Sequence, residues 1–226
     1  MNTKAISLLI GAAIVLPAAG ALAFPFGKSW HDRADGNQSN NGRAGAGGIY
    51  GTGGQTDYGI TCAHCHIGAQ GKIDVQITPT PAWLKVNNQD AYKPGQTYQI
   101  TLTMLNEWKG LNQGNNNLNG FAWTAENQSG KVAGTLISDS GVASDNCPAA
   151  YPMNPPAGTT YVYGDCHGIL FVPKNNSTTW NFSWKAPAAG AGQVTVFYSV
   201  VDGDHADKSS LDDDVRSGTI KLVEGN

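Results

Sequence analysis

Apolar and polar side chains alternate along most of the chain beyond residue 72. The alternation is strict over residues 73–77 and again over residues 97–104, where the turn Lys93-Pro94-Gly95 precedes the run. A period of two places every second side chain on one face, which is typical of a β-strand with one buried side. A proline and a glycine in the turn favour a tight reversal before the second strand. Both segments are therefore predicted to be half-buried strands.

The same pattern predicts six more strands further along the chain. Segment 194–201 is almost continuously apolar, as expected of a central strand that is covered on both faces. No period of 3.6 residues is sustained, so the domain is predicted to be all-β, and short strands separated by turns favour a sandwich. The further strands are expected at 119–125, 132–138, 168–172, 179–185, 194–201 and 217–223.

The N-terminus has the features of a secretory signal peptide. Lys4 precedes an apolar run, Pro17 interrupts it, and the small-residue sequence Ala21-Leu22-Ala23 follows. Residues 1–23 are predicted to be a leader, which places the protein in the periplasm or outside the cell. No later apolar stretch of about 20 residues suggests a membrane span after the leader is removed.

Residues 24–59 contain mainly Gly, Asn, Gln and Ser from position 28 onward. Such a segment cannot bury enough apolar surface to fold alone, so it is predicted to be a flexible arm. The alternative is an arm held against the following segment or a neighbouring subunit.

Charge narrows the classes of partner. The formal net charge is −3, loss of Lys4 makes it one unit more negative, and no cluster of Lys or Arg forms a basic face. Nucleic acid is therefore not an expected partner.

The sequence Cys62-Ala63-His64-Cys65-His66 is the main chemical signal. Two thiols separated by two intervening residues can form thioethers with the two vinyl groups of haem, and a histidine directly after the second thiol can ligate the iron. We predict one covalent haem c at Cys62 and Cys65 with His66 as proximal iron ligand, in an attachment segment, residues 60–71, ahead of a sandwich at 72–226. A thioredoxin-like pair would need a βαβ context, zinc would need more ligands, and a plain disulfide remains open.

The distal iron ligand is left open by the sequence. His167 and His205 are the first two candidates, each as a metal ligand in a loop that could reach the same end of a sandwich as the attachment segment. The others are His31, His64, Met104 and Met153, with Met104 expected to pack in the core because it lies on the apolar face of a strand.

Two further features are predicted from the loops. Cys147 and Cys166 are expected to form a disulfide, since the compartment is oxidising and the other two thiols are used. The acidic stretch between Asp202 and Asp214 is expected to be a solvated loop, with a calcium site as the alternative because carboxylate oxygens suit that ion.

Four segments follow one another in a characteristic order: Tyr92-Lys93-Pro94-Gly95-Gln96-Thr97-Tyr98, Gly120-Phe121, Thr179-Trp180-Asn181-Phe182-Ser183-Trp184-Lys185-Ala186-Pro187 and Gly192-Gln193-Val194-Thr195-Val196-Phe197-Tyr198. With these segments the sequence from Gly59 to Val223 resembles the reeler-type domain, known in bacteria as a choice-of-anchor domain, whose members often begin with a Cys-x-x-Cys-His segment. The resemblance implies an immunoglobulin-like β-sandwich and says little about biochemical role. The stretch 138–168 is longer than the family pattern.

Together these features predict an exported monohaem cytochrome-like protein that transfers electrons to redox partner proteins or to copies of itself, and not an enzyme. Two alternatives remain: a surface module of the reeler type that binds a protein or glycan, and a five-coordinate haem sensor or peroxidase. A peroxidase would need acid–base groups near the iron, and the sequence offers only the candidate histidines.

Overall fold

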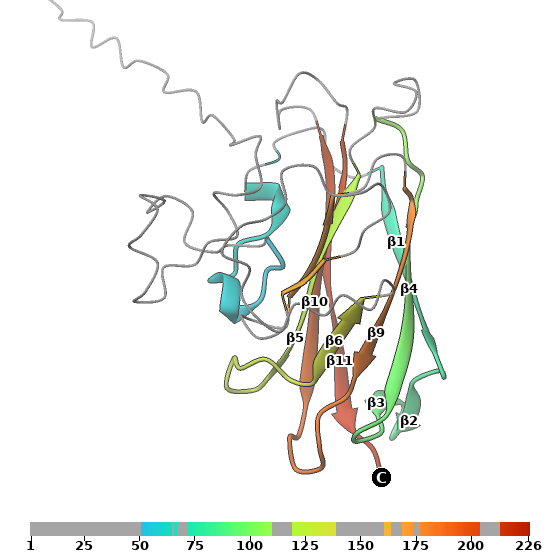
Figure 1. Cartoon of the computed structure of the whole chain (residues 1–226), viewed down its shortest axis with the longest axis vertical. Coiled ribbons are helices and arrows are strands. Elements are labelled where there is room, and N and C mark those ends of the chain that lie inside the picture. The colour runs from blue at the N-terminus through green and yellow to red at the C-terminus, as the bar shows by residue number, and fades with distance from the viewer. Residues whose placement is uncertain are drawn as a thin grey trace, which may run out of the picture.

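The described part of the chain folds into two β-sheets packed face to face (Figure 1). In this computed structural model it comprises residues 51–64, 66, 72–109, 119–138, 161–163, 169–173, 177–203 and 213–226. Within those ranges two short 3-10 helices occur, η2 (Gln55–Asp57) and η3 (Cys62–His64). No helix there is long and apolar enough to cross a membrane.

The smaller sheet has the order β1-β4-β9-β6 with antiparallel neighbours. Its strands alternate between exposed and buried positions. β4 exposes its polar threonine and glutamine side chains wholly or partly and buries its apolar ones, except for the exposed Leu105 at its end. The predicted period of two is thus realised as one core face and one outer face. The strands are β1 (Asp74–Thr80), β4 (Thr97–Leu105), β9 (Thr179–Lys185) and β6 (Thr135–Ser138).

The larger sheet has the order β2-β3-β11-β10-β5-β8-β7. Only β3 and β11 are parallel neighbours, and β10 lies centrally between β11 and β5. The central place of β10 confirms the prediction that segment 194–201 is a central strand, although Thr195, Phe197 and Tyr198 are only partly buried, so the strand is not fully covered. The strands are β2 (Leu84–Val86), β3 (Gln89–Tyr92), β11 (Asp214–Glu224), β10 (Val194–Asp202), β5 (Gly120–Asn127), β8 (Ile169–Pro173) and β7 (Tyr161–Tyr163).

An aromatic core fills the space between the two sheets. Trp184 on β9 lies 6.0 Å from Tyr98 and from Tyr92, ring centroid to ring centroid, and Phe121 on β5 packs at 5.5 Å against Phe182 on β9. All five side chains are at most 1% exposed. Aromatic rings bury large areas and gain further from offset and edge-on contacts, so this cluster is the main source of stability for the sandwich.

All eight strands predicted from the sequence are present, and three short ones were missed. β2 and β7 have three residues each and β3 has four, too few to establish a period of two. β2 and β3 form a hairpin whose turn residues Asn87 and Asn88 both have positive φ. Paired asparagines favour this left-handed turn, so the Asn-Asn pair was the one local signal for that hairpin.

A hydrogen-bonded clamp closes the sandwich end near the C-terminus. The Glu224 carboxylate accepts hydrogen bonds from the Gly190 and Gly192 amides, each at 2.8 Å, and the Tyr92 hydroxyl donates to the Gly192 carbonyl at 2.8 Å. The amides hold the pKa of Glu224 below its usual value. Burial, and secondarily the Glu224 charge, raise the pKa of Tyr92 to about 12.

This raised pKa predicts an alkaline loss of stability. Because Tyr92 ionises near pH 10 in the unfolded chain and at about 12 when folded, its contribution is complete below pH 10 and is lost as the pH rises toward 12. The free energy of unfolding should fall by about 2 kcal/mol across that window. Urea unfolding at a series of pH values measures this fall. It should shrink in Tyr92→Phe and persist in Tyr58→Phe, since Tyr58 is 78% exposed.

Candidate haem-attachment site

The attachment motif lies on the outer face of the larger sheet. Figure 1 shows η3 beside β10, on the side away from β4 and β9. The Cys62 amide donates to the Gly51 carbonyl at 3.0 Å and to the Ser199 hydroxyl of β10 at 3.3 Å. Ser199 in turn lies 2.7 Å from the Ser217 hydroxyl on β11. The first residue of the motif is therefore tied to the two central strands by its backbone.

Small residues let the Cys62 side chain approach the sheet. Cys62 is 9% exposed and packs with Ala122, Val201 and Val215. A Cβ added at Gly51 would meet the Cys62 sulfur at 3.1 Å, and φ at Gly51 is +77°. Glycine suits this position because it tolerates positive φ and leaves room for the sulfur.

Buried carboxylates fasten the segment that precedes the motif. Asp57 accepts hydrogen bonds from the Thr52 amide at 2.8 Å and from its hydroxyl, closing a loop whose ends pair at Thr52 and Thr61. Glu126 on β5 accepts from the Gln55 amide at 2.8 Å and the Thr56 amide at 3.0 Å. Residues 51–59 of the predicted arm are thus held on the sandwich, while 24–50 lie outside the described residues.

His66 contacts a carboxylate from the far end of the chain. Its Nδ1 lies 2.5 Å from the Asp213 Oδ2, and the two side chains are 36% and 6% exposed. An ionised carboxylate only accepts hydrogen bonds, so the imidazole Nδ1 is the donor. The arrangement leaves Nε2, the second ring nitrogen of His66, for another partner. The His66 amide donates to the Cys62 carbonyl at 2.9 Å, which fixes the histidine to the motif.

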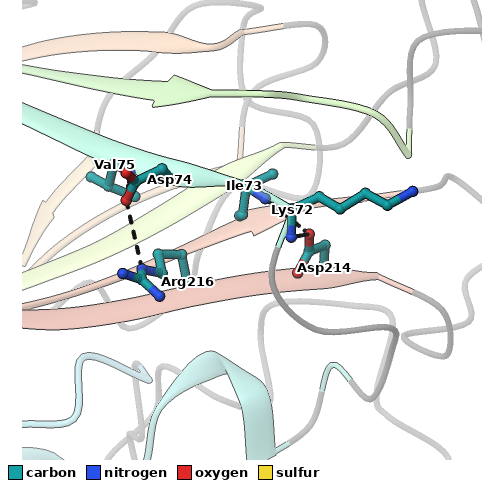
Figure 2. Close-up of polar contacts among 6 residues, drawn as sticks. All are labelled: Lys72, Ile73, Asp74, Val75, Asp214 and Arg216. Carbon is teal, nitrogen blue, oxygen red and sulfur yellow. Dashed lines mark hydrogen bonds and ion pairs between the residues drawn. The ribbon is translucent and has the colours of Figure 1, made fainter.

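Asp214, the next residue, fastens the chain that follows the motif. Its carboxylate accepts hydrogen bonds from the Lys72 amide at 3.0 Å and the Ile73 amide at 3.1 Å (Figure 2). It also accepts from the Trp108 indole Nε1 at 2.7 Å. Nearby, the Asp202 carboxylate accepts from the Trp108 amide at 2.9 Å. Asp213 and Asp214 therefore hold His66 and the backbone that leads into β1, respectively.

The acidic stretch is not the solvated loop that was expected, at least where it is described. Asp202, Asp213 and Asp214 are 0–5% exposed and accept hydrogen bonds from other segments. The sequence could not reveal this because each partner is far away along the chain, 147 positions in the case of His66. Asp204, Asp207 and Asp212 lie outside the described residues. Within the described ranges no group of three His, Cys, Asp or Glu side chains could hold a metal ion.

The structure describes only part of the predicted site. His64 is exposed, and its Nδ1 accepts a hydrogen bond from the Thr61 amide at 3.1 Å. Met104 is 3% exposed in the core, which confirms its predicted packing role. The remaining predicted ligands and thiols, Cys65, His31, His167, His205, Met153, Cys147 and Cys166, lie outside the described residues.

Comparison with known proteins finds only distant structural likenesses. No family model and no curated protein matches the chain. Among solved structures, the Reelin-N domain of F-spondin has 19% sequence identity and a TM-score of 0.42, covering 73% of this chain and 96% of that one. The human F-spondin reeler domain has 20% identity and a TM-score of 0.41, covering 70% of this chain and 95% of that one.

A third solved structure is AvmM, which catalyses macrocyclisation in alchivemycin A biosynthesis. It has 12% identity and a TM-score of 0.32, covering 70% of this chain and 93% of that one. The first two matches are reeler domains, the family that the sequence resembles. With TM-scores below 0.5, these likenesses carry no further argument, and the two-sheet architecture stands on the strands described above.

Proposed function

We propose that the chain is an exported, single-haem electron carrier in which Cys62 and Cys65 hold haem c and His66 binds the iron. The observation that carries the proposal is the contact between His66 Nδ1 and the Asp213 carboxylate at 2.5 Å. Histidines that ligate a metal through one ring nitrogen generally donate the other N–H to a carboxylate or carbonyl. His66 has such a partner and keeps Nε2 for the iron.

The donor set fits the group chemically. The motif supplies the two thiols and the imidazole that c-type attachment uses, and bound haem c supplies a one-electron iron(III)/iron(II) couple. The chain's own residues position the ligand: Gly51 and Ser199 hold the Cys62 backbone, and Asp213 orients the His66 ring. We propose a carrier rather than an enzyme, because a single covalently held haem is sufficient for one-electron transfer to a redox partner.

Burial of Cys62 bears on how haem could be attached. The sulfur lies against β5 and β10 with 9% of the residue exposed, so a porphyrin vinyl group cannot reach it in this position. The proposal therefore requires the Cys62 side chain to lie further from the sheet in the haem-loaded chain.

The partners of such a carrier are other redox proteins or further copies of the chain. The distal iron ligand is assigned to His167 or His205, and a disulfide to Cys147 and Cys166, on the sequence alone. Export rests on the leader at residues 1–23. Calcium has no support among the described carboxylates, because those of Asp213 and Asp214 accept hydrogen bonds from protein groups.

Expression of the full chain in a bacterial host with a cytochrome maturation system tests the proposal. The purified protein should show the sharp absorption bands of reduced c-type haem and a mass equal to residues 24–226 plus one haem. Cys62→Ser or Cys65→Ser should remove one of the two covalent links, and the double variant should lose all covalent haem. His64→Ala is the matched control and should remain coloured, because His64 is exposed and accepts only from Thr61.

A colourless wild-type chain whose motif thiols are free, oxidised or bound to zinc would overturn the proposal. It would favour a surface or interaction module of the reeler type. Two of the solved structures reported above are themselves reeler domains.

One feature of this chain also suits the alternative. The outer face of the smaller sheet presents an uncharged row of hydroxyl and amide side chains, with Thr78, Thr101 and Asn181 directly side by side. Thr101 donates to the Asn181 amide oxygen at 2.8 Å. Neutral hydrogen-bonding groups of this kind suit a polar, uncharged ligand such as a glycan. Retention on immobilised neutral polysaccharide by the colourless chain would support the module.

A further inference from the structure

We infer that Asp213 is a positioning residue that fixes the His66 imidazole in the Nδ1-protonated form and lowers the reduction potential of iron bound at Nε2. The inference rests on the proposed function and adds the direction in which this chain shifts the reduction potential of the bound iron. It assigns a role to a residue that neither the motif nor its neighbours in sequence pointed to.

The geometry gives Asp213 this role and gives Asp214 a different one. Asp213 Oδ2 lies 2.5 Å from His66 Nδ1, whereas Asp214 Oδ2 accepts from the Lys72 and Ile73 amides and the Trp108 indole. One carboxylate therefore contacts the ligand ring and its neighbour contacts the backbone that follows. Asp213 immediately precedes β11 and Asp214 is its first residue. From Asp214 to Leu222 this strand pairs with β10, so it cannot shift without disturbing the sheet.

Burial increases the effect of the Asp213 charge. Its side chain is 6% exposed, while the His66 ring is 36% exposed and can meet a ligand on its outer side. A carboxylate screened little by water interacts more strongly with the ring than an exposed one would. It therefore favours a proton on Nδ1 and electron density on Nε2.

The consequence for bound iron follows from ligand basicity. A carboxylate on the outer N–H of a ligating histidine raises the basicity of the nitrogen that binds the metal. A more basic ligand stabilises iron(III) relative to iron(II), so one-electron reduction becomes less favourable. The same histidine with a neutral partner at Nδ1 should give a higher potential.

The first test needs no haem and no substitution. In the haem-free chain, ¹⁵N NMR recorded at a pH at which the His66 ring is neutral should show the proton on Nδ1, and Asp213→Asn should let the Nε2-protonated form appear, because an amide can donate as well as accept. Asp74→Asn removes the same charge from an exposed site and should change nothing at His66. Wild-type His66 with its proton on Nε2 would overturn the inference.

The second test uses the haem-loaded chain. Redox titration should show that Asp213→Asn favours reduction by about tenfold in the equilibrium constant, a rise of ~59 mV for a one-electron couple. Asp74→Asn should stay close to the wild-type potential. A change in Asp213→Asn no larger than in Asp74→Asn would overturn the inference. A colourless chain would overturn the proposed function instead, and the NMR result would still decide whether Asp213 orients His66.

Discussion

Replacing Asp214 by alanine is expected to lower the free energy of unfolding by about 4 kcal/mol. The substitution removes the acceptor for the Lys72 and Ile73 amides and for the Trp108 indole N–H. The Ile73 contact is buried, the Lys72 and Trp108 contacts are partly buried, and Asp214 itself is fully buried. A buried donor left without a partner costs roughly 1–3 kcal/mol, and a partly buried one costs less. A loss of this size is a large fraction of the stability of a typical domain. Urea unfolding followed by tryptophan fluorescence measures it.

Asp74→Ala is the matched control for this prediction. Asp74 lies close to the same backbone amides, directly after Ile73 in the sequence. It is exposed, however, and its ion pair with Arg216 spans 3.7 Å (Figure 2). An exposed pair of this kind contributes little, so the change should stay within about 0.5 kcal/mol. If Asp214→Ala lowered the free energy of unfolding no more than Asp74→Ala, the hydrogen bonds of Asp214 would not be what holds the residues before β1 in place. Hydrogen exchange at Ile73 should rise only in Asp214→Ala.

Trp184→Ala is expected to be the most destabilising single change in the core, at about 3–5 kcal/mol. The ring is fully buried, lies 6.0 Å from the rings of Tyr92, Tyr98 and Trp83, and donates through Nε1 to the Ala133 carbonyl at 3.0 Å. Removing it leaves both a cavity and a buried carbonyl without its donor. The urea midpoint should fall with little change in the slope of the transition.

Lys185→Ala, at the next position of β9, is the control for the core variant. Its side chain points to the outer face and is exposed, so its loss should leave the midpoint almost unchanged. Equal effects of the two substitutions would mean that the sheets are not packed through the aromatic cluster. A fall in the slope as well as the midpoint for Trp184→Ala would indicate a change in the folded or unfolded ensemble beyond a cavity.

Strand positions could be predicted because alternation is a local property of the sequence. The run at 97–104 appears as β4 with its apolar residues buried, and the continuous run at 194–201 appears as the central strand β10. Pairing order could not be predicted in this way. The parallel contact between β3 and β11 joins Ala91 to Val223, and no local pattern encodes so distant a neighbour.

The candidate site, too, could be predicted from the sequence only in part. Cys62, Cys65 and His66 stand together in the sequence, so a shared role in haem attachment could be proposed from spacing alone. Asp213 was not evident, because its partner lies in another part of the chain and acidic residues in a loop usually face water. The anchoring role of Glu126 was hidden for the same reason, since its carboxylate acts on amides 70 and 71 positions away.

The separation of 147 positions between His66 and its carboxylate partner has a consequence for biogenesis. In a chain that is threaded through a membrane from its N-terminus, His66 emerges long before Asp213 is synthesised or translocated. Contacts of such long range also form late in folding, because the loop between them must first close. The carboxylate partner of the His66 Nδ1 is therefore acquired late, and a chain that ends before Asp213 would lack it.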